Sequence, residues 1–255
     1  MPDVHFVSFA SGRLGGSLAR IRREAEALGC FRSLHALTPH WLGPDYWAVH
    51  AGTVRRQRRG FGFWTWKPHV LRRMLAEIPV GDVLVYCDAG CSLNVEGVPR
   101  LAEYADLAAG HPSQVLAFAL DQPVRMWTKR AAIVAAAASD DVLARPMVSA
   151  TALIARASAV AIDLMREWEG RMADVGVVDD SPSAAGEHAD FRAHRHDQSV
   201  FSLLVHERAI QTIPDETWWH PVWDERREFP IHARRWRHRL PWSQAWMRRR
   251  RWPRW

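Results

Sequence analysis

Short apolar runs of strand length alternate along this chain with stretches of helical periodicity, and this alternation most constrains the fold. Strands are expected at about residues 4–10, 31–37, 82–87, 115–120, 148–155 and 210–213. Helices are expected between them, at about residues 14–28, 68–78, 96–109, 128–138, 156–172 and 196–207. The first helix should end at Gly29, a residue suited to a C-terminal cap. Strands that alternate with helices predict an open, mostly parallel α/β sheet flanked by helices.

Two segments lack either pattern and are expected to be irregular. Residues 38–63 are rich in proline and glycine, and the polar residues 174–190 are expected to form a mobile loop. No Pro- or Ser-rich linker divides the chain, so one domain is expected over residues 1–231, followed by a tail over residues 232–255. The 255 residues are 48% hydrophobic and 24% charged, which excludes disorder along the whole chain.

The basic character of the chain belongs to this tail. Residues 232–255 hold nine Arg, no Lys and no acid, whereas the net charge of the whole chain is +6. The tail also holds five tryptophans, at positions 236, 242, 246, 252 and 255. Arginine mixed with tryptophan suits an anionic membrane surface, but the same mixture is compatible with a solvated basic terminus or with nucleic-acid binding. Specific nucleic-acid binding is not expected, because basic runs are unspecific signals.

Several other classes of protein are not supported. Three cysteines favour a reducing compartment over a disulfide framework, and Cys87 and Cys91 have no second pair to complete a zinc site. No run of 18 uncharged apolar residues is present, and the N-terminus has no basic region before an apolar core. A cytoplasmic protein is therefore expected, peripheral on the inner face of the plasma membrane if the tail binds lipid. P-loop, Gly-x-Ser-x-Gly and His-Glu-x-x-His motifs are absent.

The most informative stretch is Arg59-Gly-Phe-Gly-Phe-Trp-Thr-Trp-Lys-Pro68. Trp64, Trp66 and Lys67 lie where a glycine-rich loop meets an expected helix N-terminus. Helix N-termini and lysine both favour anions such as a diphosphate. The two tryptophans either line a ligand cleft or cover the edge of the sheet.

Asp88 follows directly after the strand Asp82-Val-Leu-Val-Tyr-Cys87. A carboxylate there lies at the carboxyl end of the sheet, where open α/β sheets bind ligands. It can hold a divalent cation that in turn binds a diphosphate. The alternative is an aspartate that caps a turn or a helix.

Three blocks in this order, RGFGFWTWKP, GDVLVYCDAG and HRHDQSVFSLL, resemble a family of bacterial glycosyltransferase-like proteins with the nucleotide-diphospho-sugar transferase (GT-A) fold, often associated with surface polysaccharides. The resemblance covers about residues 4–232. It implies transfer of a sugar from a nucleotide-sugar donor to a glycan or lipid-linked glycan acceptor. In related enzymes an Asp-x-Asp pair holds Mn²⁺ or Mg²⁺; here Asp88 matches the first acid, but Gly90 replaces the second.

The resemblance also implies roles for individual residues. Asp88 and Asp197 would be catalytic, with Asp197 as the general base or an orienting group, although Asp197 also suits a helix N-cap. The metal would be held by Asp88 with His220 or His232. Donor or acceptor contacts would come from Ser8, Phe9, Arg13, Trp64, Trp66, Lys67, Tyr86, Ala89, Gly90, Trp127, Lys129 and Gln198. The missing second acid leaves one alternative open, a non-catalytic nucleotide- or carbohydrate-binding protein of the same fold.

Overall fold

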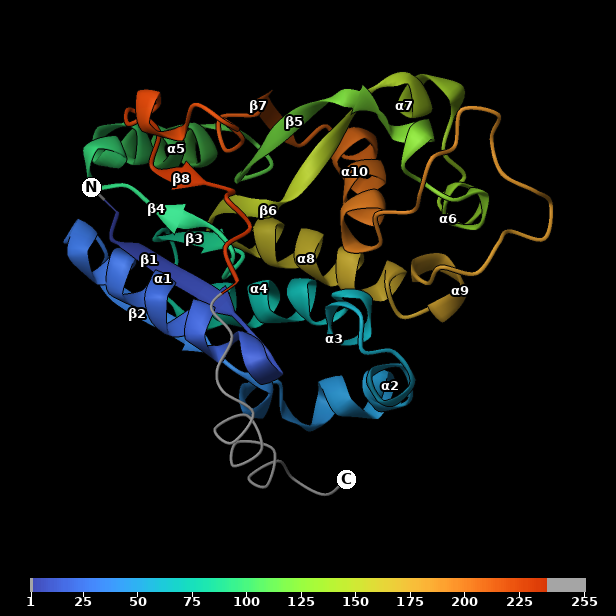
Figure 1. Ribbon diagram of the computed structural model, residues 1–255, viewed down its shortest axis with the longest axis horizontal. Coiled ribbons are helices and arrows are strands. Elements are labelled where there is room, and N and C mark those ends of the chain that lie inside the picture. Colours follow the sequence, from blue (N-terminus) through green and yellow to red (C-terminus); the bar gives the residue numbers. More distant parts are fainter. Residues whose placement is uncertain (1, 238–255) are drawn as a thin grey trace.

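A computed structural model describes residues 2–237, and its centre is a six-stranded sheet in the order β2-β1-β3-β6-β5-β7 (Figure 1). The strands are β1 (Val4–Phe9), β2 (Ser33–Leu37), β3 (Val83–Cys87), β5 (Val115–Pro123), β6 (Pro146–Arg156) and β7 (Gln211–Pro214). Strand β6 runs antiparallel to both of its neighbours, and the other three pairs of strands are parallel. The predicted fold class, an open and mostly parallel sheet flanked by helices, is confirmed.

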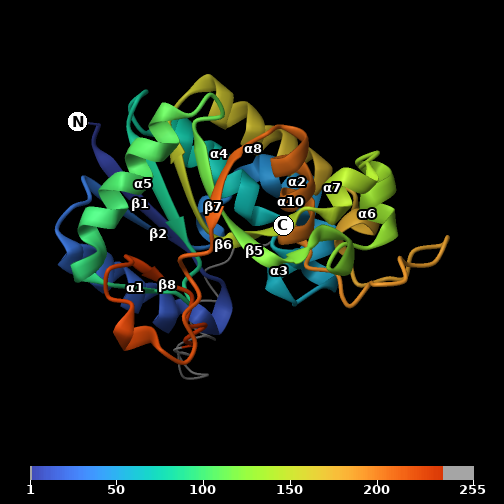
Figure 2. The same ribbon diagram turned by 90° about the horizontal axis from the view of Figure 1, so that it is seen from above.

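Helices cover both faces of this sheet (Figure 2). Helices α1 (Gly15–Leu28) and α5 (Val98–Gly110) lie on one face, where Ile21 and Tyr104 join one apolar cluster. Helices α4 (Trp66–Glu77), α8 (Ala159–Arg171) and α10 (Asp197–Glu207) lie on the other, where Met74, Trp168 and Phe201 join a second cluster. Burial of an apolar helix stripe against the sheet is the main force that holds such layers together.

The predicted C-terminal cap of the first helix is confirmed, and the structure shows a further cap at Ser158. Helix α1 ends at Gly29, whose φ of 67° is left-handed, and its N–H bonds to the Glu26 carbonyl oxygen. Helix α8 begins after Ser158, whose hydroxyl accepts a hydrogen bond from the Ala161 N–H. Helix α10 begins at Asp197 itself, so His196, and not Asp197, occupies the N-cap position.

The prediction that residues 38–63 are irregular is wrong. They contain α2 (Gly43–Arg56) and α3 (Gly60–Phe63). Pro44 lies in the first turn of α2, where a missing N–H costs no hydrogen bond, so proline here begins a helix instead of breaking one. The structure also contains α6 (Arg130–Ala135), α7 (Asp140–Ala144) and, within the expected loop 174–190, the short α9 (Val175–Val178).

A second, two-stranded sheet pairs β4 (Ser92–Leu93) with β8 (Ile231–His232), which the sequence patterns did not predict. The expected boundary between residues 231 and 232 therefore falls inside β8. The chain then continues across the end of β3, where the Trp236 N–H donates to the Gly90 carbonyl oxygen at 2.9 Å. The rest of the predicted tail, with Trp242, Trp246, Trp252 and Trp255, lies outside the described residues.

Candidate functional site

The chain reverses its direction of winding between β1 and β3. Strand β2 lies beyond β1 on one side, whereas β3 and the later strands lie on the other side. Val7 of β1 is level with Tyr86 of β3, so Phe9 and Asp88 both lie at the carboxyl ends of these neighbouring strands. Open α/β sheets bind ligands at such a switch point, so the structure places Asp88 where a ligand is expected.

Within residues 2–237 the Asp88 carboxylate is held by side chains and not by main-chain amides. Tyr86, at the end of β3, donates its hydroxyl to Asp88 Oδ1, and Lys67 Nζ lies 3.2 Å from the same oxygen. Asp88 Oδ2 has no hydrogen-bond partner within residues 2–237, and the side chain is 31% exposed. One carboxylate oxygen is therefore fixed, and the other is available to accept hydrogen bonds from a ligand.

Lys67 is the centre of the site. Its Nζ lies 2.6 Å from Asp197 Oδ2 and donates to the Ala150 carbonyl oxygen at 2.8 Å, and its side chain is only 3% exposed. Burial disfavours the ammonium, but the attraction of Asp197 and Asp88 outweighs it and raises the pKa of Lys67. Lys67 is therefore charged at neutral pH, and it joins the end of β3 to the start of α10. We refer to Asp88, Lys67 and Asp197 as the ion cluster.

Asp197 is the most enclosed acid of the ion cluster, with a side chain that is 7% exposed. Burial raises the pKa of Asp197 to about 6, against the attraction of Lys67 and with the help of the Asp88 charge. The preceding residue, His196, has a φ of 52° and a ψ of −118°, a conformation that favours glycine. Its ring is held by a 2.7 Å contact between Nδ1 and the Val178 carbonyl oxygen and by stacking on Phe63.

A left-handed turn positions the aromatic residues beside the ion cluster. All five residues of the segment 60–64 have a positive φ, between 55° and 84°. Each non-glycine residue in this conformation costs about 1–2 kcal/mol, and a Cβ on Gly60 would lie only 2.3 Å from the Trp64 ring. The turn stacks Trp64 on His196 at 5.4 Å and leads directly into the first turn of α4, which carries Lys67. Strained backbone of this kind is concentrated at functional sites.

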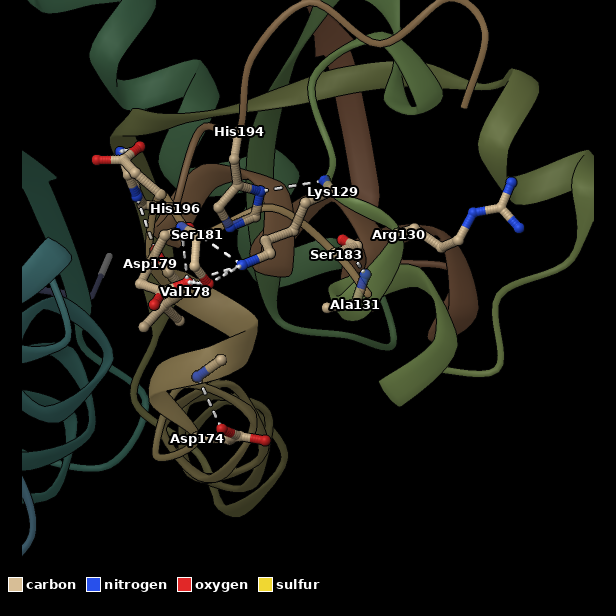
Figure 3. A network of polar contacts seen from close by, with 12 residues as sticks. Lys129, Arg130, Ala131, Asp174, Val178, Asp179, Ser181, Ser183, His194 and His196 are labelled. Atoms are coloured by element: carbon tan, nitrogen blue, oxygen red, sulfur yellow. Dashed lines mark hydrogen bonds and ion pairs between the residues drawn. The ribbon is translucent and has the colours of Figure 1, made fainter. Parts of the chain in front are cut away.

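A second polar network ties the segment 179–187 to the start of α6 (Figure 3). Lys129, 2% exposed, places its Nζ 2.7 Å from Asp179 Oδ1, and its backbone N–H donates to His194 Nδ1 at 3.3 Å. Ser183 and Glu187 accept the N–H groups of Ala131 and Arg130. The expected loop is thus anchored through its polar side chains, and the Lys129 ammonium is enclosed by protein acceptors.

The other sequence-predicted contact residues differ in how deeply they are buried. Ser8, Phe9, Trp66, Tyr86 and Ala89 are buried, and Phe9 stacks on Trp66 with ring centroids 4.1 Å apart. Residues that are partly exposed are Arg13, Trp64, Gly90, Trp127 and Gln198. The partly exposed residues have surface that a ligand can contact directly, whereas the side chains of the buried residues have little. Their contacts with donor and acceptor remain predictions.

The residues predicted to hold a metal ion do not meet. His232 is buried in β8, with its Nε2 3.0 Å from the Arg226 carbonyl oxygen, and His220 is exposed and stacks on Trp218. Within residues 2–237, no group of three or more His, Cys, Asp and Glu side chains is arranged to hold a metal ion. A Cβ on Gly90 would touch the Arg235 backbone, with its Cα 3.4 Å away. The described residues therefore do not form the donor set that Mn²⁺ or Mg²⁺ prefers.

No helix among residues 2–237 combines the length and the apolar character needed to cross a membrane.

Two arginines near the ion cluster, Arg195 and Arg235, were not predicted as site residues. Arg195 lies inside the quoted block HRHDQSVFSLL, so its position in that block was the available signal. Arg235 was interpreted only as part of the basic tail.

Comparison with known proteins found no matching family model and no matching curated protein. Among solved structures, mouse xyloside xylosyltransferase 1 in its apo form aligns with a TM-score of 0.48 and 10% identity, over 94% of this chain and 100% of that chain. A glycosyltransferase involved in the glycosylation of the major capsid of PBCV-1 aligns with a TM-score of 0.47 and 10% identity, over 96% of this chain and 98% of that chain.

Proposed function

We propose that this protein transfers a sugar from a nucleotide-diphosphate donor to a glycan acceptor. The observation that carries the proposal is the ion cluster at the switch point of the sheet. Its three members come from the three sequence blocks on which the glycosyltransferase resemblance rests, and these blocks are far apart along the chain. Their meeting at one ligand-binding position supports a shared function.

The chemistry follows from the state of each carboxylate. Asp88 Oδ2 would accept hydrogen bonds from hydroxyl groups of the donor, because Oδ1 is already held by Tyr86 and Lys67. In the transfer, the bond between the anomeric carbon and the diphosphate oxygen breaks, and the acceptor oxygen bonds to that carbon. Asp197, ionised at neutral pH, would receive the acceptor proton, directly or through one water. Gln198, partly exposed, would bind a sugar hydroxyl.

The test is an assay of donor cleavage by the full chain. UDP- and GDP-sugars are incubated with the protein, with and without Mn²⁺, and the released nucleotide is measured. At least one donor should be cleaved, slowly by water and faster when a suitable glycan acceptor is added. Binding of a donor without turnover under every condition would favour the alternative, a non-catalytic nucleotide- or carbohydrate-binding protein.

The rate of transfer should rise with pH and level off above an apparent pKa of about 6. This rise follows from the raised pKa of Asp197, because Asp197 loses its proton as the pH rises through about 6 and can then act as a base. The measurement is kcat/KM between pH 5 and pH 8. Asp215, another acid with a raised pKa, lies at the end of β7, three strands from β3. The Asp215→Asn variant should therefore show the same rise of kcat/KM with pH as the wild type. A flat profile in the wild type would contradict a role for Asp197 as the base.

We further propose that the acceptor is a cell-surface glycan or its lipid-linked precursor, and that the arginine- and tryptophan-rich tail holds the enzyme at the inner face of the plasma membrane. Flotation with vesicles tests the second part. The full chain should float with vesicles that contain anionic lipid and much less with neutral ones, whereas a chain that ends at residue 237 should not float. Equal flotation of both chains would contradict the role of the tail.

A further inference from the structure

Two arginines beside the ion cluster carry positive charges that no acidic side chain within residues 2–237 neutralises. Arg195 lies over Trp127, with its Cζ 4.1 Å from the ring centroid, and Arg235 lies over Trp218 at 4.9 Å. Neither guanidinium has a carboxylate within 4.0 Å among residues 2–237. Each is therefore positioned by an aromatic ring, and its hydrogen-bonding edge is not used by an acid.

The positive charge of Arg235 disfavours the charged form of Arg195, although the two side chains lie over different rings. The pKa of Arg195 is lowered, first by partial burial and then by the charges of Arg235 and Arg59. Arg59 is neutralised by Asp180, whose Oδ2 lies 3.0 Å from it, so the excess charge belongs to the other two. Like charges held together without a counterion are unfavourable in an empty site and become favourable when an anion binds between them.

Each arginine lies next to a segment that carries a member of the ion cluster. Arg195 precedes Asp197 by two residues, and its carbonyl oxygen accepts the Gln198 N–H at 3.1 Å. Arg235 lies against Gly90, two residues after Asp88, and its Cα is 3.4 Å from the point where a Cβ on Gly90 would be. The backbone of a basic residue thus lies next to the position at which the related enzymes carry their second acid.

We infer that Arg195 and Arg235 bind the diphosphate of the donor and stabilise it as it leaves, in place of a divalent cation. The inference rests on the proposed function and deepens it. A guanidinium can donate two parallel hydrogen bonds to phosphate oxygens. When the bond between the anomeric carbon and the diphosphate oxygen breaks, its electron pair stays on that oxygen, and the diphosphate gains one negative charge. Two fixed positive groups interact more strongly with the leaving diphosphate, which carries this extra charge, than with the intact donor. This difference lowers the barrier and accelerates the transfer.

The test measures binding of UDP and GDP by calorimetry with the full chain in EDTA, followed by the same titrations with Mn²⁺. We expect the wild type to bind one of these nucleotides in EDTA and Mn²⁺ to change its affinity by less than about twofold. Arg195→Met and Arg235→Met should each weaken binding by at least about tenfold, which corresponds to the loss of one charge-assisted contact. Arg195→Lys should recover part of the loss. The matched control is Arg166→Met, which removes an exposed arginine of α8, and should bind as the wild type does.

The possible outcomes separate this inference from the proposed function. If EDTA abolishes binding and donor cleavage, Mn²⁺ restores both, and the two Arg→Met variants behave as the wild type, the arginine inference is wrong and the transferase proposal stands. If neither nucleotide binds and no donor is cleaved under any condition, both are wrong. Thermal unfolding of each variant is measured alongside. Where an Arg→Met variant does not fold, the Arg→Lys variant at the same position is titrated in its place.

Discussion

Replacing Asp88 by asparagine should lower the rate of donor cleavage by about 100-fold or more, with little change in thermal stability. Asparagine keeps the size of the side chain but removes the negative charge that Lys67 and Tyr86 hold in place. Loss of one preorganised polar group in an active site typically costs about 10²–10³ in rate. Because the Asp88 side chain is 31% exposed, its replacement should shift the midpoint of thermal unfolding by only a few degrees.

Asp82 provides the matched control for this substitution. It lies at the opposite end of the same strand, just before Val83, and its carboxylate binds His5 and the Asp3 N–H. Asp82→Asn also removes one partly buried carboxylate, but far from the ligand-binding edge of the sheet, so donor cleavage should stay within about twofold of the wild type. Equal losses of stability and activity in Asp88→Asn would show that Asp88 is only structural.

Replacing Lys67 by methionine should reduce the free energy of unfolding by about 3–5 kcal/mol at pH 7, the range found when one partner of a buried ion pair is removed. Methionine fills most of the same space, but Asp197 and Asp88 would then face each other without a cation. The loss should shrink as the pH falls from 8 to 5, because protonation of Asp197 removes one of the two negative charges, and removal of the Lys67 charge raises the pKa of Asp197 further above its ordinary value. Urea unfolding at pH 5 and pH 8 measures both effects.

A double variant distinguishes lost electrostatics from lost packing. In Lys67→Met combined with Asp197→Asn, the more buried carboxylate is also neutral, so at least about 1 kcal/mol of stability should return relative to Lys67→Met alone. Donor cleavage should not return, because both groups belong to the proposed site. If the two substitutions destabilise additively, the contact between Lys67 and Asp197 contributes little, and the account of the ion cluster is wrong.

The order of strands and helices was predictable because it depends on short-range patterns. Six apolar runs became the six strands of the main sheet, and the cap at Gly29 depends only on neighbouring residues. Failures occurred where the pattern was weak or ambiguous. Proline and glycine in residues 38–63 were interpreted as helix breakers, although Pro44 lies in the first turn of α2. Strands β4 and β8 are two residues long, too short to show any periodicity, and exist because they pair with each other.

The candidate site divides in the same way. Asp88, Lys67 and Asp197 could each be selected from the sequence, because each stands at the end of a strand or the start of a helix. Their relation could not be predicted, because it depends on side chains that are distant in the sequence. Lys67 was expected to bind a diphosphate, but its ammonium is buried against two carboxylates and a carbonyl oxygen. Arg235 was assigned to the tail because nothing local indicates that it lies against Gly90.

The sequence by itself determined the α/β class, the approximate positions of the strands and the residues that stand at the ligand-binding edge, because these depend on periodicity and on groups close together in the chain. Only the tertiary structure decided which charges neutralise one another and which remain available for a ligand. A charge is stabilised by whatever lies within a few ångströms of it, and in this protein those neighbours come from β3, α4, α10 and the segment after β8.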